Sequence, residues 1–242
     1  KKIEKILISY SYSTIVLTDA ARKYLLSKSE FNHKKIFTIP TCVDHVKFDE
    51  RNLKSDLIIS NNIVIGTFGT INSGWFMMKE FANFLSLFKT INPKTIFRIV
   101  TQDNPEQLLS QFSSFGINKD DVEIYSASSN KMPEEIVKFD IVIMFFVSNF
   151  SKLGSAPTRF GEALASGIPC VVNSGVGDLD KIVYENKVGV VTHEFTDLAM
   201  KKSCNEIISL LRDKSARNRC RDVSKKYFSF EVANNYYEDL YG

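Results

Sequence analysis

K-L-G-S-A-P-T-R-F-G-E-A-L-A-S-G-I-P-C-V-V-N, residues 152–173, combines a polar loop, a short helix and a buried strand. Pro157 suits the first turn of a helix, where its missing N–H costs nothing. Gly167 is a natural residue just past a helix end. The apolar run 170–172 is typical of a strand buried on both faces. We therefore expect a helix over 158–165 followed directly by a strand.

The expected helix would present free amide groups and a partial positive charge to the loop before it. A helix N-terminus that follows a strand and a loop is a ready-made site for anions. Glu162, about one turn inside, could accept hydrogen bonds from hydroxyl groups of a ligand. In the plainer interpretation Glu162 only stabilises the helix dipole and Arg159 is a solvated surface charge.

Strands and helices alternate along the rest of the chain. Strands are expected at residues 14–18, 35–39, 63–68, 95–100, 122–125, 141–146 and 188–191, and helices at 1–12, 19–27, 75–88, 105–115, 133–139, 179–185, 197–212, 215–225 and 230–241. Alternation with apolar strands predicts an α/β fold with a Rossmann-like, doubly wound parallel sheet.

Several side chains near these elements have structural interpretations. Asp19 and Asp178 are expected to cap helices, and Asn104 and Asp103 are more simply caps than ligands of a ribose. Trp75 is assigned to the core with the neighbouring phenylalanines, since large aromatic side chains dominate cores.

Ligands of an open parallel sheet bind outside the carboxyl ends of its strands. Loops 66–74, 101–105, 126–131 and 148–157 would lie there. The first, G-T-F-G-T-I-N-S-G, follows a strand and precedes a helix, so its amides could cradle a diphosphate. It lacks the G-x-G-x-x-G spacing of dinucleotide-binding loops.

The composition is that of an ordinary soluble globular protein, with 44 % apolar and 24 % charged residues among 242. A net charge of +3 does not indicate nucleic-acid binding, which needs a concentrated basic stripe. The scattered cysteines and histidines show no zinc-type spacing, so we expect reduced thiols and no metal site. No apolar run could span a membrane and no signal peptide is recognisable. The chain begins without Met and inside an expected helix, so we expect a fragment.

The segment 154–173 resembles the donor-binding signature of the retaining GT-B glycosyltransferases of family 4 (group 1). That signature reads Glu, seven residues, Glu, then Ala-x-Ala-x-Gly-x-Pro-Val-Val, and here the second Glu is Glu162, followed in step by Ala163, Ala165, Gly167 and Pro169. A subset of the family has Ser-x-Pro-Thr-Lys/Arg-Phe-x-Glu, which 155–162 resembles closely. Residues 40–48 are similar to the family's Ile-Pro-Asn-Gly-Val-Asp-x-x-x-Phe element, with Thr41 and Cys42 in place of Asn-Gly.

The resemblance implies a site for a nucleotide-diphosphate sugar. The family's second Glu holds the ribose, which can be carried over to Glu162. Its first Glu contacts the transferred hexose, but that position is Gly154 here, so this contact cannot be carried over. The Arg and Lys that often bind the diphosphate are replaced by Thr70 and Ser73, so the phosphate charge must be met elsewhere.

Arg159 is the first candidate for the diphosphate because Arg favours planar oxyanion partners, and Lys152 is the second. Arg159 and Glu162 are the predicted catalytic residues. The predicted donor-binding residues are Gly69, Thr70, Asn72, Ser73, Gly74, Ser126, Ser128, Lys152, Gly154, Ser155, Pro157 and Thr158. The loop that contains Ser126 and Ser128 would contact the nucleobase, mainly through its backbone. No cofactor is expected besides the donor substrate.

The resemblance also implies how the chain is organised. Residues 1–48 would be the end of an N-terminal, acceptor-side domain that is mostly absent, and residues 49–61 would be a linker. Residues 62–225 would form the C-terminal, donor-binding domain. The last helix, 226–242, would pack back against the N-terminal part. The function implied is hexosyl transfer with retention to a carbohydrate or lipid-linked acceptor, as in polysaccharide biosynthesis. We expect a cytoplasmic protein with little turnover as a fragment. The lysine pairs 34–35, 201–202 and 225–226 are interpreted as solvated faces, with a weak peripheral contact to an anionic membrane as the alternative.

Two other functions stay open. A sugar-nucleotide epimerase of the same architecture would need acid/base carboxylates and histidines, and the shortage of histidines counts against it. A non-catalytic nucleotide-sugar-binding or interaction domain is slightly favoured by the missing first Glu and the missing Arg/Lys pair.

Overall fold

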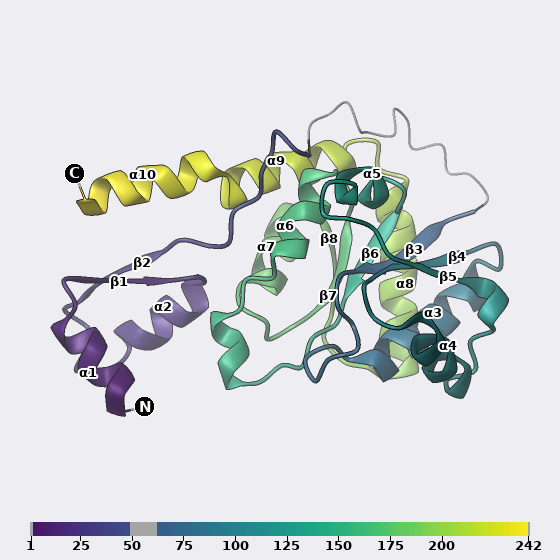
Figure 1. Cartoon of the computed structure of the whole chain (residues 1–242), viewed down its shortest axis with the longest axis horizontal. Helices are drawn as coiled ribbons and strands as arrows, with labels where there is room; N and C mark the ends of the chain where they lie inside the picture. Colours follow the sequence, from purple (N-terminus) through teal and green to yellow (C-terminus); the bar gives the residue numbers. More distant parts are fainter. Residues whose placement is uncertain (1, 49–61, 242) are drawn as a thin grey trace.

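A six-stranded parallel sheet forms the larger part of the computed structural model, which describes residues 2–48 and 62–241 (Figure 1). The spatial order is β5 (Val122–Tyr125), β4 (Ile96–Val100), β3 (Val64–Phe68), β6 (Ile141–Met144), β7 (Cys170–Asn173) and β8 (Gly189–Thr192). The chain runs outward from β3 in one direction and from β6 in the other, so the predicted doubly wound fold is confirmed. The predicted linker, 49–61, lies outside the described residues.

Helices cover both faces of this sheet. They are α3 (Met78–Ile91), α4 (Pro105–Ser114), α5 (Met132–Ile136), α6 (Thr158–Ala165), α7 (Leu179–Asn186), α8 (Asp197–Leu211) and α9 (Ala216–Phe228). Helix α3 packs against α8, and α6 packs against α9. Because crossovers between parallel strands are right-handed, winding in opposite directions places α3 and α6 on opposite faces.

Phenylalanine fills much of the core. The fully buried phenylalanines are Phe81, Phe84, Phe88, Phe97, Phe112, Phe139, Phe145 and Phe160. Strands β6 and β7 are buried at every position, which explains the apolar runs 141–144 and 170–172. Helix α6 has the predicted bounds, and Gly167 follows it with a φ of +73° that suits glycine.

A smaller part lies beside the sheet. It consists of α1 (Lys2–Tyr10), β1 (Ser13–Val16), α2 (Asp19–Leu26) and β2 (Lys35–Thr38), with β1 and β2 paired in parallel. Figure 1 shows α10 (Phe230–Tyr241) leaving the six-stranded part and running along the side of β2. The boundaries of domains stay a prediction.

The two parts are joined by hydrogen bonds between segments far apart in the sequence. The Asp178 carboxylate accepts the N–H of Asp19 at 2.6 Å and that of Ala20 at 2.9 Å. Thr18 donates to the Leu153 carbonyl. Asp178 is the N-cap residue of α7, as expected, but its carboxylate makes no capping bond there and instead binds the N-terminus of α2. The expected cap at Asp19 is wrong, because Thr18 is the N-cap residue of α2 and accepts the Ala21 N–H.

Helix α3 begins at Met78, later than the expected start at Trp75. The Trp75 carbonyl accepts the Val147 N–H, and Phe76 forms an antiparallel bridge with Phe146. This pairing removes residues 75–77 from the helix. It also explains why β6 ends at Met144 and does not continue to the expected Phe146.

Candidate functional site

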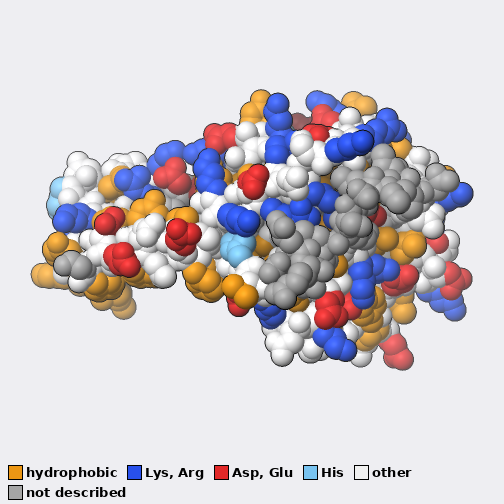
Figure 2. Space-filling view, turned by 90° about the horizontal axis from the view of Figure 1, so that it is seen from above, with side chains coloured by type: hydrophobic (Ala, Val, Ile, Leu, Met, Phe, Trp, Pro, Cys, Tyr) orange, Lys and Arg blue, Asp and Glu red, His pale blue; other side chains and the backbone are white. Residues whose placement is uncertain are grey.

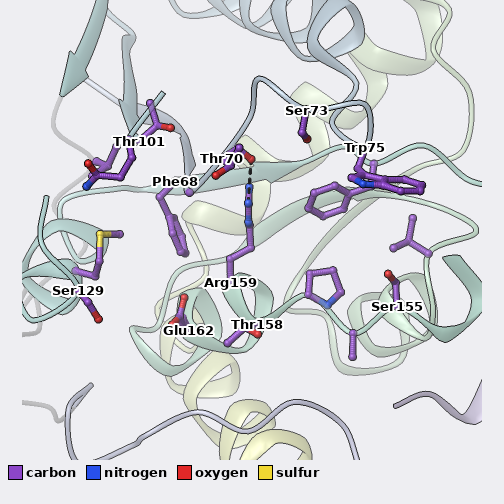
Figure 3. Close-up of a pocket in the computed structure, with 18 of the residues that line it drawn as sticks. Phe68, Thr70, Ser73, Trp75, Thr101, Ser129, Ser155, Thr158, Arg159 and Glu162 are labelled. Carbon is purple, nitrogen blue, oxygen red and sulfur yellow. Dashed lines mark hydrogen bonds between the residues drawn. The ribbon is translucent and has the colours of Figure 1, made fainter. Parts of the chain in front are cut away.

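A cleft of about 970 Å³ opens where the strand order reverses between β3 and β6. Loops that follow these two strands diverge, which leaves a space outside their carboxyl ends. The 3₁₀ segment Phe150–Gly154 and the first turn of α6 complete its wall. In Figure 3, Thr101 and Ser129 lie at one end, Arg159 and Thr70 in the middle, and Trp75 at the other end.

Most of the predicted site residues line this cleft. They are Gly69, Thr70, Ser73, Lys152, Gly154, Ser155, Pro157, Thr158, Arg159 and Glu162. Asn72, Gly74, Ser126 and Ser128 are exposed and do not line it. Asn72 donates to the Gln107 side chain at 3.1 Å, and the loop after β5 contributes Ala127 and Ser129 in place of their predicted neighbours.

Arg159 extends from the first turn of α6 into the middle of the cleft. Its Nη2 donates to the Thr70 carbonyl at 3.0 Å, and its guanidinium lies 5.5 Å from the centre of the Phe146 ring. A Cβ at Gly69 would lie 2.8 Å from Nη2, so glycine there admits the guanidinium. Nη1 is buried and has no hydrogen-bond partner in the described part of the chain.

The charge of Arg159 is held in a largely apolar setting. Burial lowers the pKa of Arg159 below its usual value, and the carboxylates of Glu162 and Asp103 oppose this shift. An arginine remains protonated at neutral pH even so. The cleft therefore holds a fixed cation with a buried N–H group that has no acceptor among residues 2–48 and 62–241.

Glu162 lies one turn further along α6 and also lines the cleft (Figure 3). Burial raises the pKa of Glu162 from 4.5, while Lys47 and Arg159 oppose the rise. Lys47 comes from the segment after β2, and its ammonium donates to the Ser129 hydroxyl at 3.1 Å. A half-buried carboxylate at this point can accept hydroxyl groups of a ligand.

The N-terminus of α6 offers further donors. Pro157 is its N-cap residue and makes no side-chain capping bond. Neither the Thr158 N–H nor the Arg159 N–H has a hydrogen-bond partner within the described ranges. The guanidinium and these amides are the kinds of group that bind anions in proteins.

Asp103 does not cap α4, and the expectation that it would is wrong. Asn104 is the cap, as expected, because its side chain accepts the Gln107 N–H at 3.0 Å. The Asp103 carboxylate instead accepts the N–H of Ile71 at 2.7 Å and that of Asn72 at 3.0 Å. Two amides of the loop 69–74 that were expected to cradle a diphosphate are therefore already bonded within the protein.

Trp75 is not a core residue, so that expectation is wrong as well. It is 53 % exposed and lines the cleft. The Lys152 ammonium lies over its indole, 4.1 Å from the ring centre. Because residues 75–77 pair with 145–147 and are not helical, the indole is not part of the packed face of α3 and lines the cleft (Figure 3).

Sequence reasoning missed several residues of the cleft. They are Leu17, Val100, Met132 and Phe146, which lie outside the loops expected at the site. Val100 ends an expected strand, so its position at a strand terminus could have indicated it. Leu17 comes from the smaller part of the molecule, and no local pattern in the sequence marks it.

Two general properties bear on the chemistry. Across residues 2–48 and 62–241, no group of three or more His, Cys, Asp and Glu side chains could hold a metal ion. Within the same ranges, no helix is long and apolar enough to cross a membrane. Figure 2 shows Lys and Arg side chains interspersed with acidic ones over the face it presents.

The doubly wound sheet, with a cleft at its switch point, defines a Rossmann-like α/β protein. The chain belongs to the glycosyl transferases group 1, whose family model matches residues 71–227. No curated protein matches the chain.

Solved structures support the fold. A glycosyltransferase from Rickettsia africae ESF-5 has a TM-score of 0.75 at 15 % identity, over 100 % of this chain and 66 % of its own. HepE from Anabaena, in complex with UDP-glucose, has a TM-score of 0.70 at 16 % identity, over 99 % and 66 %. A sucrose-phosphate synthase from Thermosynechococcus elongatus has 0.69 at 15 % identity, over 99 % and 60 %. The fold is that of GT-B glycosyltransferases, and the chain spans 66 % or less of these three proteins.

Proposed function

We propose that the cleft binds a nucleoside-diphosphate sugar and that this chain is the donor-binding part of a retaining hexosyltransferase. The observation that carries the proposal is the buried Arg159 Nη1 without an acceptor, next to the free amides at the start of α6. A diphosphate would supply acceptors to all of these donors.

The order of residues along the cleft fits such a donor. Thr101 and Ser129 would lie at the nucleobase, Glu162 at the ribose, Arg159 and Thr158 at the diphosphate, and Trp75 and Ser155 at the sugar (Figure 3). The UDP-glucose bound by HepE of Anabaena is a ligand of this class.

The chemistry follows from where charge develops. As the bond from the anomeric carbon to the diphosphate oxygen breaks, negative charge grows on the diphosphate. Arg159 and the α6 amides are fixed before the reaction and stabilise that charge without reorganising. Glu162 holds the ribose so that the anomeric carbon faces the acceptor. In this proposal no cofactor takes part, and protein groups do the work of a metal ion.

The acceptor would approach from the side of Leu17, the point at which the smaller part of the molecule reaches the cleft. A carbohydrate or lipid-linked acceptor is the class proposed, as in the synthesis of polysaccharides on the cytoplasmic side of a membrane. Most of the acceptor-side domain would lie outside this chain, so we expect the chain alone to bind donor but turn over little.

A binding and product experiment tests the proposal. Calorimetry of the chain with UDP-, GDP-, ADP- and CMP-sugars should find micromolar to millimolar binding of one base class. NMR of the product made by the protein with its complete acceptor-side domain should then show the donor's anomeric configuration. Inverted product would refute retention, epimerised donor would indicate an epimerase, and binding without chemistry would indicate a binding domain. Failure of every nucleotide sugar to bind would exclude the proposed function.

A further inference from the structure

Asp103 holds together two loops at the floor of the cleft. Its Oδ2 accepts three hydrogen bonds, from the Ile71 N–H, the Asn72 N–H and the Thr101 hydroxyl, the last at 2.9 Å. The Asp103 N–H returns a bond to the Thr101 hydroxyl oxygen at 3.0 Å. The carboxylate therefore ties the loop after β3 to the end of the neighbouring strand β4.

These bonds fix the direction of one backbone group that matters to the cleft. Thr70 directly precedes the two amides that Asp103 accepts, and its carbonyl accepts the Arg159 Nη2–H at 3.0 Å. With the next two amides held on the Asp103 side, the Thr70 carbonyl points to the guanidinium. Gly69, whose φ is +81°, turns the chain immediately before it.

The arrangement is not needed for α4, because Asn104 already caps that helix. Asp103 also does not offer its carboxylate to the cleft, since Oδ2 is directed to the loop amides and Asp103 is not among the residues that line the cleft. Burial raises the pKa of Asp103, but hydrogen bonds from Asn72 and Ile71 outweigh it, so the group is ionised at neutral pH.

We propose that Asp103 is a positioning residue, which fixes the loop 69–74 so that the Thr70 carbonyl holds Arg159 at the diphosphate. The inference rests on the proposed function. In this inference the Ile71 and Asn72 amides bind the Asp103 carboxylate and not the ligand, and the Arg159 guanidinium binds the diphosphate. A second consequence is that Asp103 acts on the ligand only through Arg159.

A double-mutant cycle tests this dependence. Asp103→Asn keeps a hydrogen-bond acceptor and removes the charge, and Asp103→Ala removes both. We expect affinity for UDP or GDP, whichever the wild-type chain binds, to fall about tenfold in Asp103→Asn and further in Asp103→Ala, while affinity for the matching nucleoside stays within about twofold. In an Arg159→Gln background, Asp103→Asn should have no further effect, because the group through which it acts is gone.

Asp213→Asn is the matched control. Asp213 also accepts a backbone N–H and a hydroxyl of a loop residue, Ser215, but it lies between α8 and α9 and does not line the cleft. Circular dichroism at matched temperature establishes that each variant is folded before binding is compared.

The outcomes separate this inference from the proposed function. If the wild-type chain binds no nucleoside diphosphate, the proposed function fails and the inference fails with it. Equal or tighter binding by Asp103→Asn would overturn the inference alone and would mean that freed loop amides bind phosphate. An undiminished effect in the Arg159→Gln background would also overturn it, since Asp103 would then act without Arg159.

Discussion

The loops that follow β3 and β6 stand opposite each other at the same switch point, yet they are built differently. Loop 69–74 carries no charged side chain, and its Ile71 and Asn72 amides are bonded to Asp103. Loop 148–157 leads into α6 with Lys152 and Arg159 at the cleft and two free amides at the helix start. Lys152 and Arg159 therefore lie on the side of the cleft formed by loop 148–157 and α6, while the side formed by loop 69–74 is uncharged.

The difference teaches that a helix after a parallel strand is not by itself an anion site. Helix α3 follows loop 69–74, but its start is displaced to Met78 because Phe76 pairs with Phe146. Its N-terminal amides therefore do not reach the cleft in the way that those of α6 do. At α6, in contrast, the cations, the free amides and the helix start lie together at the cleft.

The largest loss of ligand affinity is expected from removing the Arg159 guanidinium at the start of α6. Arg159→Gln should cost about 2–5 kcal/mol of binding free energy for a nucleoside diphosphate, since the charged phosphate is left without its partner. Isothermal titration calorimetry measures this. Arg98→Gln is the control, because Arg98 pairs with Glu123 at 2.7 Å outside the cleft.

The same variant allows the charge to be moved to the opposite wall. Thr70→Arg added to Arg159→Gln should recover about tenfold in affinity, since a guanidinium from the loop would enter the same space. If affinity does not recover, a guanidinium on loop 69–74 cannot replace the one on α6.

A smaller loss is expected at the other functional side chain of α6. Glu162→Gln should cost about 1.5–3 kcal/mol with a ribonucleoside diphosphate, because hydrogen bonds to a charged acceptor are lost. The loss should vanish with the 2′,3′-dideoxy analogue, which has no ribose hydroxyl groups to bind. An equal loss with both ligands would refute a contact to ribose.

Glu162 also sets a pH dependence. Burial raises its pKa above 4.5, so its carboxylate is protonated at a higher pH than a free glutamate. Affinity of the wild-type chain should fall as pH decreases toward this raised pKa, and that fall should be absent in Glu162→Gln.

A single methyl group added to loop 69–74, at Gly69, should lower the stability of the fold. Gly69→Ala places a side chain at a φ of +81° and 2.8 Å from Arg159 Nη2, which should destabilise the fold by about 1–3 kcal/mol. Urea unfolding measures the change. Gly154→Ala is the control, because a Cβ there meets no atom within 4 Å and stability should be unaffected.

The smallest effect is expected at the end of the cleft. Trp75→Leu removes the ring beneath the Lys152 ammonium and should weaken donor binding by about 0.5–1 kcal/mol. In a Lys152→Gln background the same substitution should change binding little, and a full effect there would show that Trp75 contacts the ligand directly.

The sequence predicted well where local signals decide the structure. Pro157, Gly167 and the apolar run that follows gave α6 and β7, and the alternation of elements gave the sheet. It failed where the outcome depends on distant partners. Asp103 looked like a cap because the N–H groups that donate to its carboxylate lie some 30 residues earlier in the chain, at Ile71 and Asn72. Trp75 looked like core because its pairing with Val147 has no local signature.

The two hydrogen bonds from the start of α2 to Asp178 have a consequence for how the molecule could be divided. They join groups 159 and 158 residues apart, so the docking of α2 does not depend on an unbroken backbone between them. Residues 2–48 and 62–241, produced as separate chains, should therefore associate and elute as one species in size-exclusion chromatography.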